Sequence, residues 1–261
     1  MPRAPLHDDL KLHLHVLGAD HELSARARVG PTRVLEVLPL AREIADGVTA
    51  IALDHARAAG ESVSCKAGCA ACCRHIVPLA PAEAVRLAQV VDAMPKERRR
   101  AVKKRFEQAV RRMEEAGLLD PKAPRGRVAL LSPASSPRER WEDVSHRYFA
   151  MKVDCPLLED EACSVYPERP MACREYHVTT PADLCTAFDP SLQVTPRPVR
   201  MGEVVKRFTN EVLARDDHNI PLPLALEWAE IHRRAFDREA DGEELAMSLV
   251  QSIQEADDAE G

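Results

Sequence analysis

Aromatic residues and glycine are scarce in this sequence, and no long stretch of it is uniformly apolar. Phe, Trp and Tyr together make up 4% of the 261 residues, whereas hydrophobic residues make up 45%. This balance favours helices, because small and straight-chain side chains lose little freedom there, whereas strands draw on aromatic and β-branched residues. With ten Gly and twenty Pro, the chain is also neither fibrous nor of low complexity.

The sequence also lacks the marks of membrane insertion and of export. No apolar run is long enough to span a bilayer. The first residues carry Arg3, His7 and two aspartates, and no apolar stretch follows them, so we expect no signal peptide. The formal net charge of −6 favours solubility and gives no overall attraction to nucleic acid. We therefore predict a soluble, cytoplasmic protein without membrane contact, whose cysteines stay reduced.

The spacing of apolar residues predicts mostly helices. Between residues 11 and 16, polar and apolar residues alternate, which predicts a short strand with His13 and His15 on its polar face. Residues 118–137 are rich in turn formers and predict a connection. Helices are expected over residues 39–59, 81–94, 96–116, 136–151, 199–215 and 224–236.

These elements predict a mainly α fold, a helical domain with an irregular, turn-rich cysteine cluster organised around metal. Asp241 and Glu244 form a capping pair that predicts the start of a last helix, and the acidic end, 255–261, is expected to fray. We divide the chain into an N-terminal extension with the strand and an amphipathic helix (1–61), a cysteine-cluster metal-binding domain (62–190) and a C-terminal helical extension (191–261).

All eight cysteines lie in the middle of the chain, in two groups. Buried structural cysteines behave as small hydrophobes and have no reason to gather, whereas a metal ion supplies one. Eight thiolates suit two four-coordinate metal ions, or one iron–sulfur cluster and a further site, and the spacing does not say which belong together. We therefore predict zinc or iron, with an iron–sulfur cluster as one form of the iron, bound by Cys65, Cys69, Cys72, Cys73, Cys155, Cys163, Cys173 and Cys185.

Two other interpretations of the cysteines are weaker. A disulfide framework needs an oxidising compartment and usually a small domain with little core, and neither is expected here. The spacing from Cys65 through Cys69 to Cys72 matches the three-cysteine motif of radical S-adenosylmethionine enzymes. That family usually has an aromatic residue where this chain has Ala71, and no glycine-rich segment or barrel pattern follows, so we interpret the match as accidental.

Two sequence blocks around the cysteines support the metal interpretation. The first is Cys-Lys-Ala-Gly-Cys-Ala-Ala-Cys-Cys-Arg at 65–74. The second combines Cys-Pro-Leu-Leu at 155–158, Cys-Ser-Val-Tyr-Pro-Glu-Arg-Pro at 163–170 and Cys-Arg at 173–174. Across residues 62–188 the chain resembles the YkgJ-type cysteine-cluster family, which has a CxxCxxCC signature, although three residues rather than two separate its first two cysteines. The resemblance implies zinc or iron chelation and no general activity, and some relatives are associated with lysine methylation of flagellin.

Charged and imidazole side chains beside the cysteines are candidates for a second layer around the metal. Arg74 and Arg174 directly follow cysteines, and a cation there lowers a thiol pKa and offsets the negative charge of bound thiolates. His75 and His177 are also close to cysteines, where an imidazole can act as acid or base, or replace a thiolate as ligand.

Three functions are compatible with these features. A closed four-thiolate site has no open position, so we favour a metal that is structural or held for storage or delivery. The first alternative is an iron–sulfur or metal-dependent enzyme, such as a component of a protein-modifying methylase. The second is nucleic-acid binding through the basic helix at 96–112, which is less expected because glutamates interrupt the helix and aromatics are almost absent. Catalytic residues, protein partners and further cofactors are not assigned.

Overall fold

Helices dominate the fold. In the computed structural model, helices account for about 51% of the chain and strands for about 15%, which confirms the mainly α prediction. The structure describes residues 7–66 and 68–258. The helices are α1 (Leu38–Ala58), α2 (Pro81–Asp92), α3 (Lys96–Glu115), α4 (Pro137–Ala150), α5 (Met171–Glu175), α6 (Asp183–Ala187), α7 (Met201–Leu213), α8 (Ala225–His232) and α9 (Gly242–Asp258), with 3₁₀ turns η1 (Val34–Val37), η2 (Tyr166–Glu168), η3 (Leu222–Leu224) and η4 (Arg233–Asp237).

The predicted N-terminal strand is one half of a long antiparallel hairpin, formed by β1 (His7–Val16) and β2 (Ala19–Arg28). Its two turn residues, Leu17 and Gly18, have φ of 54° and 77°, the left-handed values that a two-residue hairpin turn requires. The apolar face of β1 is buried, as its alternation predicts, and His13 and His15 lie on the exposed face. The sequence analysis missed β2, because Leu23 is the one large apolar residue among its ten positions.

Three pairs of short antiparallel strands join segments that are distant along the chain or close a tight turn. The pairs join β3 (Pro31–Arg33) to β8 (Glu239–Asp241), β4 (Pro78–Leu79) to β7 (Ile220–Pro221), and β5 (Leu158–Glu159) to β6 (Ala162–Cys163). The first two pairs tie the N-terminal half of the chain to its C-terminal segment.

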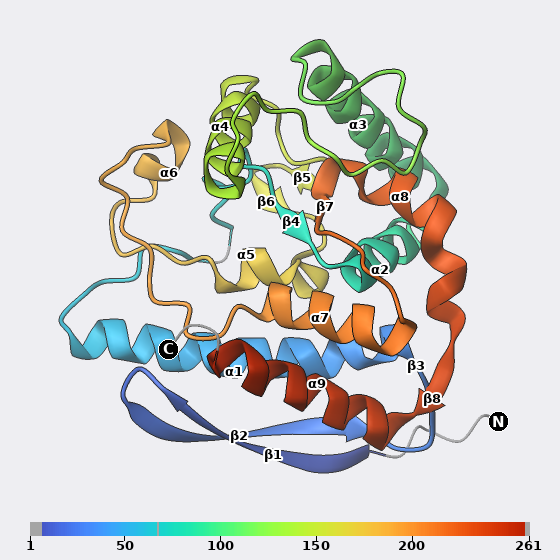
Figure 1. The fold of residues 1–261 in the computed structure, drawn as a ribbon. Coiled ribbons are helices and arrows are strands. Elements are labelled where there is room, and N and C mark those ends of the chain that lie inside the picture. The colour runs from blue at the N-terminus through green and yellow to red at the C-terminus, as the bar shows by residue number, and fades with distance from the viewer. Residues whose placement is uncertain (1–6, 67, 259–261) are drawn as a thin grey trace.

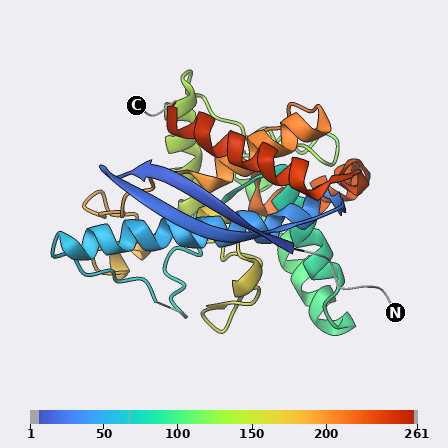
Figure 2. The same ribbon diagram turned by 90° about the horizontal axis from the view of Figure 1, so that it is seen from below.

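The long helices form a platform for the cysteine-bearing segments. The hairpin packs against α1 and α9, and α7 packs against α9 on the side away from the hairpin (Figure 1). Figure 2 shows the hairpin lying across α1 and beside α9. The short helix α5 contacts both α1 and α7. The platform therefore holds α5, which carries Cys173, from below.

Helix starts follow the expected capping chemistry. The Ser136 hydroxyl accepts a hydrogen bond from the Glu139 backbone amide at 3.3 Å, and α4 begins at the next residue, Pro137. The Asp241 carboxylate accepts the backbone amides of Glu243 and Glu244 and caps α9, as the sequence predicts. The prediction of a frayed acidic end is wrong up to residue 258, because α9 continues to Asp258, and residues 259–261 lie outside the described residues.

Candidate metal centre

The cysteines are carried by short or irregular segments. Cys65, Cys69, Cys72 and Cys73 lie in the connection between α1 and β4, and Cys155 follows α4. Cys163 is on β6, Cys173 on α5 and Cys185 on α6. Each is a free thiol in the structure. Such short elements bury little apolar surface of their own, so other contacts must hold these segments together.

Backbone hydrogen bonds join the two cysteine groups. The Cys155 amide donates to the Cys73 carbonyl at 2.8 Å, and the Ser64 amide donates to the Val178 carbonyl at 2.9 Å. The Val178 amide in turn donates to the Cys65 sulfur at 3.4 Å. These hydrogen bonds hold residues 64–73 beside Cys155 and Val178, which are far from them in the sequence.

Cys72 acts electrostatically on thiols of both cysteine groups. A hydrogen bond between the adjacent thiols of Cys72 and Cys73 lowers the pKa of Cys72 and raises that of Cys73. A negative charge on Cys72 is also close enough to help raise the pKa of thiols from both groups. Those thiols are Cys65, Cys73, Cys155, Cys163, Cys173 and Cys185.

Burial makes several of these thiols poor acids. Desolvation raises the pKa of Cys155 to about 12 and that of Cys185 to about 11, and it raises the pKa of Cys173 well above the ordinary thiol value. At neutral pH these groups are therefore protonated in the absence of a cation. A metal ion that binds them must displace their protons.

Arg169 is a cation whose charge acts on several of the thiols, and the sequence analysis did not select it. Burial raises the pKa of Cys65 and of Cys163, and the Arg169 guanidinium opposes that rise and helps lower the pKa of Cys72. The guanidinium also stacks over the ring of Tyr166, with Cζ 4.3 Å from the ring centroid. Its Nε atom is buried without a hydrogen-bond partner among the described residues. The Tyr-Pro-Glu-Arg-Pro run was the available signal. Tyr166 itself is 42% exposed.

The two arginines that follow cysteines pair with carboxylates instead. Arg74 binds Glu161 at 2.7 Å and Asp154 at 2.9 Å. Arg174 is buried and binds both carboxylate oxygens of Asp46, at 2.8 and 2.9 Å. Arg74 thus holds the β5–β6 turn next to the first cysteine group, and Arg174 anchors α5 to α1.

The two histidines occupy different environments. The His75 ring lies 5.1 Å from Phe149 and 5.2 Å from Phe188, and its Nε2 is 2.8 Å from the Cys185 carbonyl oxygen. His177 has a buried Nδ1 without a hydrogen-bond partner in the described part of the chain, and burial lowers its pKa. His75 therefore positions the segment that carries Cys185, whereas His177 keeps a neutral imidazole with a free nitrogen.

The residues present suit a thiolate-bound metal. Within residues 7–66 and 68–258, no three Cys, His, Asp or Glu side chains are already arranged so that they could hold an ion. The donor set is nevertheless the one that zinc and iron prefer. Arg169 Nε and His177 Nδ1 are buried polar atoms without a hydrogen-bond partner among the described residues. A buried polar atom without a partner destabilises the folded protein, and a hydrogen bond to a metal-bound sulfur would remove that penalty.

The basic helix α3 has contacts that bear on the cysteine region. Arg105 Nε donates to the Pro156 carbonyl at 2.7 Å, and Arg105 and Arg98 both bind Glu159, at 2.7 and 2.9 Å. Lys103 binds Asp92 at 2.7 Å. Part of the basic run therefore fastens the segment that follows Cys155. Nucleic-acid binding by this helix stays a prediction.

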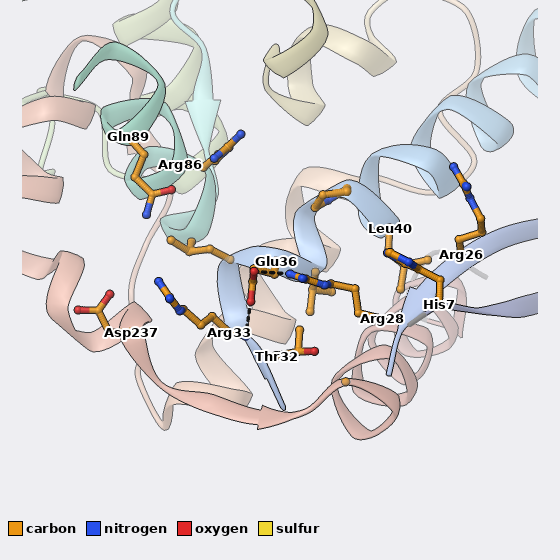
Figure 3. Close-up of a pocket in the computed structure, with 14 residues that line it drawn as sticks. His7, Arg26, Arg28, Thr32, Arg33, Glu36, Leu40, Arg86, Gln89 and Asp237 are labelled. Atoms are coloured by element: carbon orange, nitrogen blue, oxygen red, sulfur yellow. Dashed lines mark hydrogen bonds and ion pairs between the residues drawn. The ribbon is translucent and has the colours of Figure 1, made fainter. Parts of the chain in front are cut away.

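A cavity of about 430 Å³ lies elsewhere, between the open end of the hairpin, the start of α1 and helix α2 (Figure 3). None of its lining residues is a cysteine. Two of its arginines are paired, Arg28 with Glu36 and Arg86 with Glu168. The cavity is separate from the cysteine cluster.

Comparison with known proteins gives one match. The family model described as "CxxCxxCC: Putative zinc- or iron-chelating domain" matches residues 64–194, which include all eight cysteines. No curated protein and no solved structure matches the chain. Among the described residues, no helix is both long and apolar enough to cross a membrane.

Proposed function

Because the chain belongs to the CxxCxxCC family, we propose that it binds zinc or iron through its eight cysteines, as a structural ion or as one held for storage or delivery. The observation that carries this proposal is the contact between the two cysteine groups, where the Cys155 amide donates to the Cys73 carbonyl at 2.8 Å and the Val178 amide donates to the Cys65 sulfur at 3.4 Å. Packing alone gives protonated, desolvated thiols no reason to gather at one place.

The charges around the cluster also support the proposal. Four thiolates around one divalent ion leave an excess of two negative charges. Arg169 is placed among the thiols, and its Nε has no other partner in the described residues, so it can donate to a metal-bound sulfur. When bound, the metal supplies the positive charge that keeps the thiolates deprotonated.

Purification without oxygen or chelators, followed by elemental analysis and a visible absorption spectrum, tests the proposal. Stoichiometric zinc in colourless protein identifies a zinc site. Iron with sulfide and a broad visible absorbance identifies an iron–sulfur cluster. Native protein that holds neither zinc nor iron, and that fails to bind Zn²⁺ after reduction, contradicts the proposal.

A further inference from the structure

We propose that the cavity between the hairpin and α2 binds a small organic anion, a molecule that has a phosphate or carboxylate group and an apolar part. This site is separate from the cysteines, and the inference goes beyond the proposed metal binding. The cavity has a volume of about 430 Å³, which suits a small molecule and is far more than a single water needs.

The cavity is formed by segments from both ends of the chain. The open end of the hairpin and the residues from β3 to the start of α1 form most of its wall, and α2, η4 and the first residue of α9 complete it. The β3–β8 ladder ties the two ends together, with Thr32 paired to Ala240. The buried Thr32 hydroxyl donates to the Gly30 carbonyl at 2.9 Å. The fold itself therefore holds these walls in place.

Arginines outnumber carboxylates on the cavity wall. Its four arginines are Arg26, Arg28, Arg33 and Arg86, and its two carboxylates are Glu36 and Asp237. This excess of positive charge is local, because the chain as a whole has a formal net charge of −6. A guanidinium presents a planar fork of N–H donors that matches the oxygen atoms of a phosphate or carboxylate group. The residue types on the wall therefore favour an anionic ligand.

Two of the arginines are held by carboxylates. Arg28 pairs with Glu36, whose carboxylate also accepts the Arg33 backbone amide at 2.9 Å. Arg86 donates to Glu168 at 2.6 Å. Each guanidinium carries five N–H donors, so these pairs fix the two groups in place and leave further donors for a ligand.

The other two arginines provide the charge that a ligand can neutralise. Among the described residues, the Arg26 guanidinium forms no hydrogen bond or ion pair, although its backbone amide donates to Glu43 at 3.1 Å. Arg33 has an ion pair with Glu239 at 3.7 Å, and both side chains of this pair are more than half exposed. An exposed pair of this kind contributes little, so an oxyanion of the ligand can replace Glu239.

The two arginines lie on different sides of the cavity. Figure 3 shows Arg26 and His7 on the hairpin side, and Arg33, Gln89 and Asp237 on the opposite side. The Gln89 side chain is exposed and can both donate and accept hydrogen bonds. Polar groups that can orient a ligand are therefore present on both sides.

The cavity also has an apolar surface. Leu35, Val37 and Leu40 line it, and each is otherwise buried. Small-molecule sites commonly combine apolar walls with a few polar groups that fix the orientation of the ligand. A free inorganic ion would leave these apolar side chains unused, so we expect the oxyanion to belong to an organic molecule.

Calorimetric titration of the full-length protein in a phosphate-free buffer of low salt tests the proposal. The probes are phenyl phosphate, benzoate and inorganic phosphate. We expect saturable binding of phenyl phosphate or benzoate at one site per chain, and weaker binding of inorganic phosphate, which lacks the apolar part. The tighter of the two organic probes identifies the oxyanion that the site prefers. Added salt should weaken the binding, because part of the attraction is electrostatic.

Variants at exposed positions locate the binding. Arg33→Gln removes a charged donor and should weaken binding of the organic probe about 10- to 100-fold. Gln89→Glu adds a negative charge to the wall and should also weaken it, whereas Gln89→Lys should strengthen it. A matched control, Arg100→Gln, changes an exposed residue of α3 outside the cavity and should bind like the wild type.

The outcomes decide the proposal. Failure of the wild type to bind any of the three probes overturns it, as does equal affinity in the wild type, Arg33→Gln and Gln89→Glu. Inorganic phosphate that binds as tightly as phenyl phosphate overturns the assignment to an organic molecule. None of these variants alters a cysteine, so failure of the anion site leaves the proposed metal binding intact.

Discussion

The helical platform and the cysteine region are held together by different kinds of interaction. The platform is packed through fully buried apolar side chains such as Ile44, Phe208 and Leu249. The cysteine region has two-residue strands and five-residue helices, joined by backbone hydrogen bonds and ion pairs. The comparison teaches that a core can specify the platform alone, whereas the cysteine region needs further cross-links, which we assign to metal.

The largest expected effect follows from removing a buried cysteine ligand. Cys173→Ala should lose bound metal, because three thiolates and a methyl group no longer form a closed site. The cysteine region should then become open to protease while the platform stays helical. Elemental analysis and limited proteolysis measure the two effects. Unchanged metal content in a folded variant would contradict the assignment of Cys173.

Acidification should weaken metal binding strongly without a matching effect on the platform. Burial raises the pKa of Cys155 to about 12 and also raises that of Cys173, so each thiol that binds metal releases a proton. The apparent zinc affinity should therefore rise with pH and fall by at least about tenfold per unit of acidification. Competition with a zinc-binding dye at several pH values measures the slope. A flat profile would show that the thiols are not the ligands.

A substitution in the core of the platform should lower the stability of the protein without changing its zinc content. Phe208 is 2% exposed in α7, and Phe208→Ala should reduce the free energy of unfolding by about 3–5 kcal/mol through loss of apolar burial and the cavity left behind. The zinc content should not change under conditions where the protein is folded. Urea unfolding and elemental analysis on the same samples test this. Zinc loss from the folded variant would mean that the two regions are not separable.

Replacing Arg169 should lower the affinity for zinc without removing a cysteine ligand. Arg169→Met keeps a long apolar stem but removes a cation that acts on several thiols, so zinc affinity should fall about 10- to 100-fold. Arg169→Lys, which retains the charge, should recover part of the loss. Equal affinity in the wild type and Arg169→Met would remove Arg169 from the site.

The smallest expected effect concerns the contacts that Arg105 of α3 makes with Pro156 and Glu159. Arg105→Ala removes the hydrogen bond to the Pro156 carbonyl and the ion pair with Glu159, and it should destabilise the protein by about 1–3 kcal/mol. Arg100→Ala changes an exposed residue of the same helix and should stay within about 0.5 kcal/mol of the wild type. Urea unfolding of both variants makes the comparison. If Arg105→Ala and Arg100→Ala were equally stable, the contacts of Arg105 with the segment after Cys155 would not contribute to stability.

The sequence predicted the platform well because its signal is local. Apolar spacing located the helices from α1 onward, and Asp241 marked the start of α9. Only the first strand of the hairpin was predicted, because β1 alternates apolar residues with polar ones, whereas β2 has one large apolar residue, Leu23. The short helices α5 and α6 have too few residues to show a period.

The cysteine region depends on contacts that no local pattern encodes. Adjacency in sequence pointed to Arg74 and Arg174 as cations near thiols, but their guanidinium groups reach carboxylates of distant segments. Arg169, four residues from the nearest cysteine, is the one placed among the thiols. Which thiols are neighbours was likewise not encoded in their spacing, because the β5–β6 ladder and the Cys73–Cys155 bond decide it.

The pairing of β4 with β7 has a practical consequence for work on the cysteine cluster. Ile220 and Leu222 lie against the strand that leads out of the first cysteine group, since Leu79 pairs with Ile220 and the Leu222 amide donates to the Val77 carbonyl at 2.9 Å. A fragment cut to the 64–194 stretch would lose these partners and expose apolar surface that the intact protein hides from water. We therefore expect the truncated fragment to fold poorly and to aggregate. If such a fragment failed to bind zinc, the result would not test whether the cysteines are metal ligands.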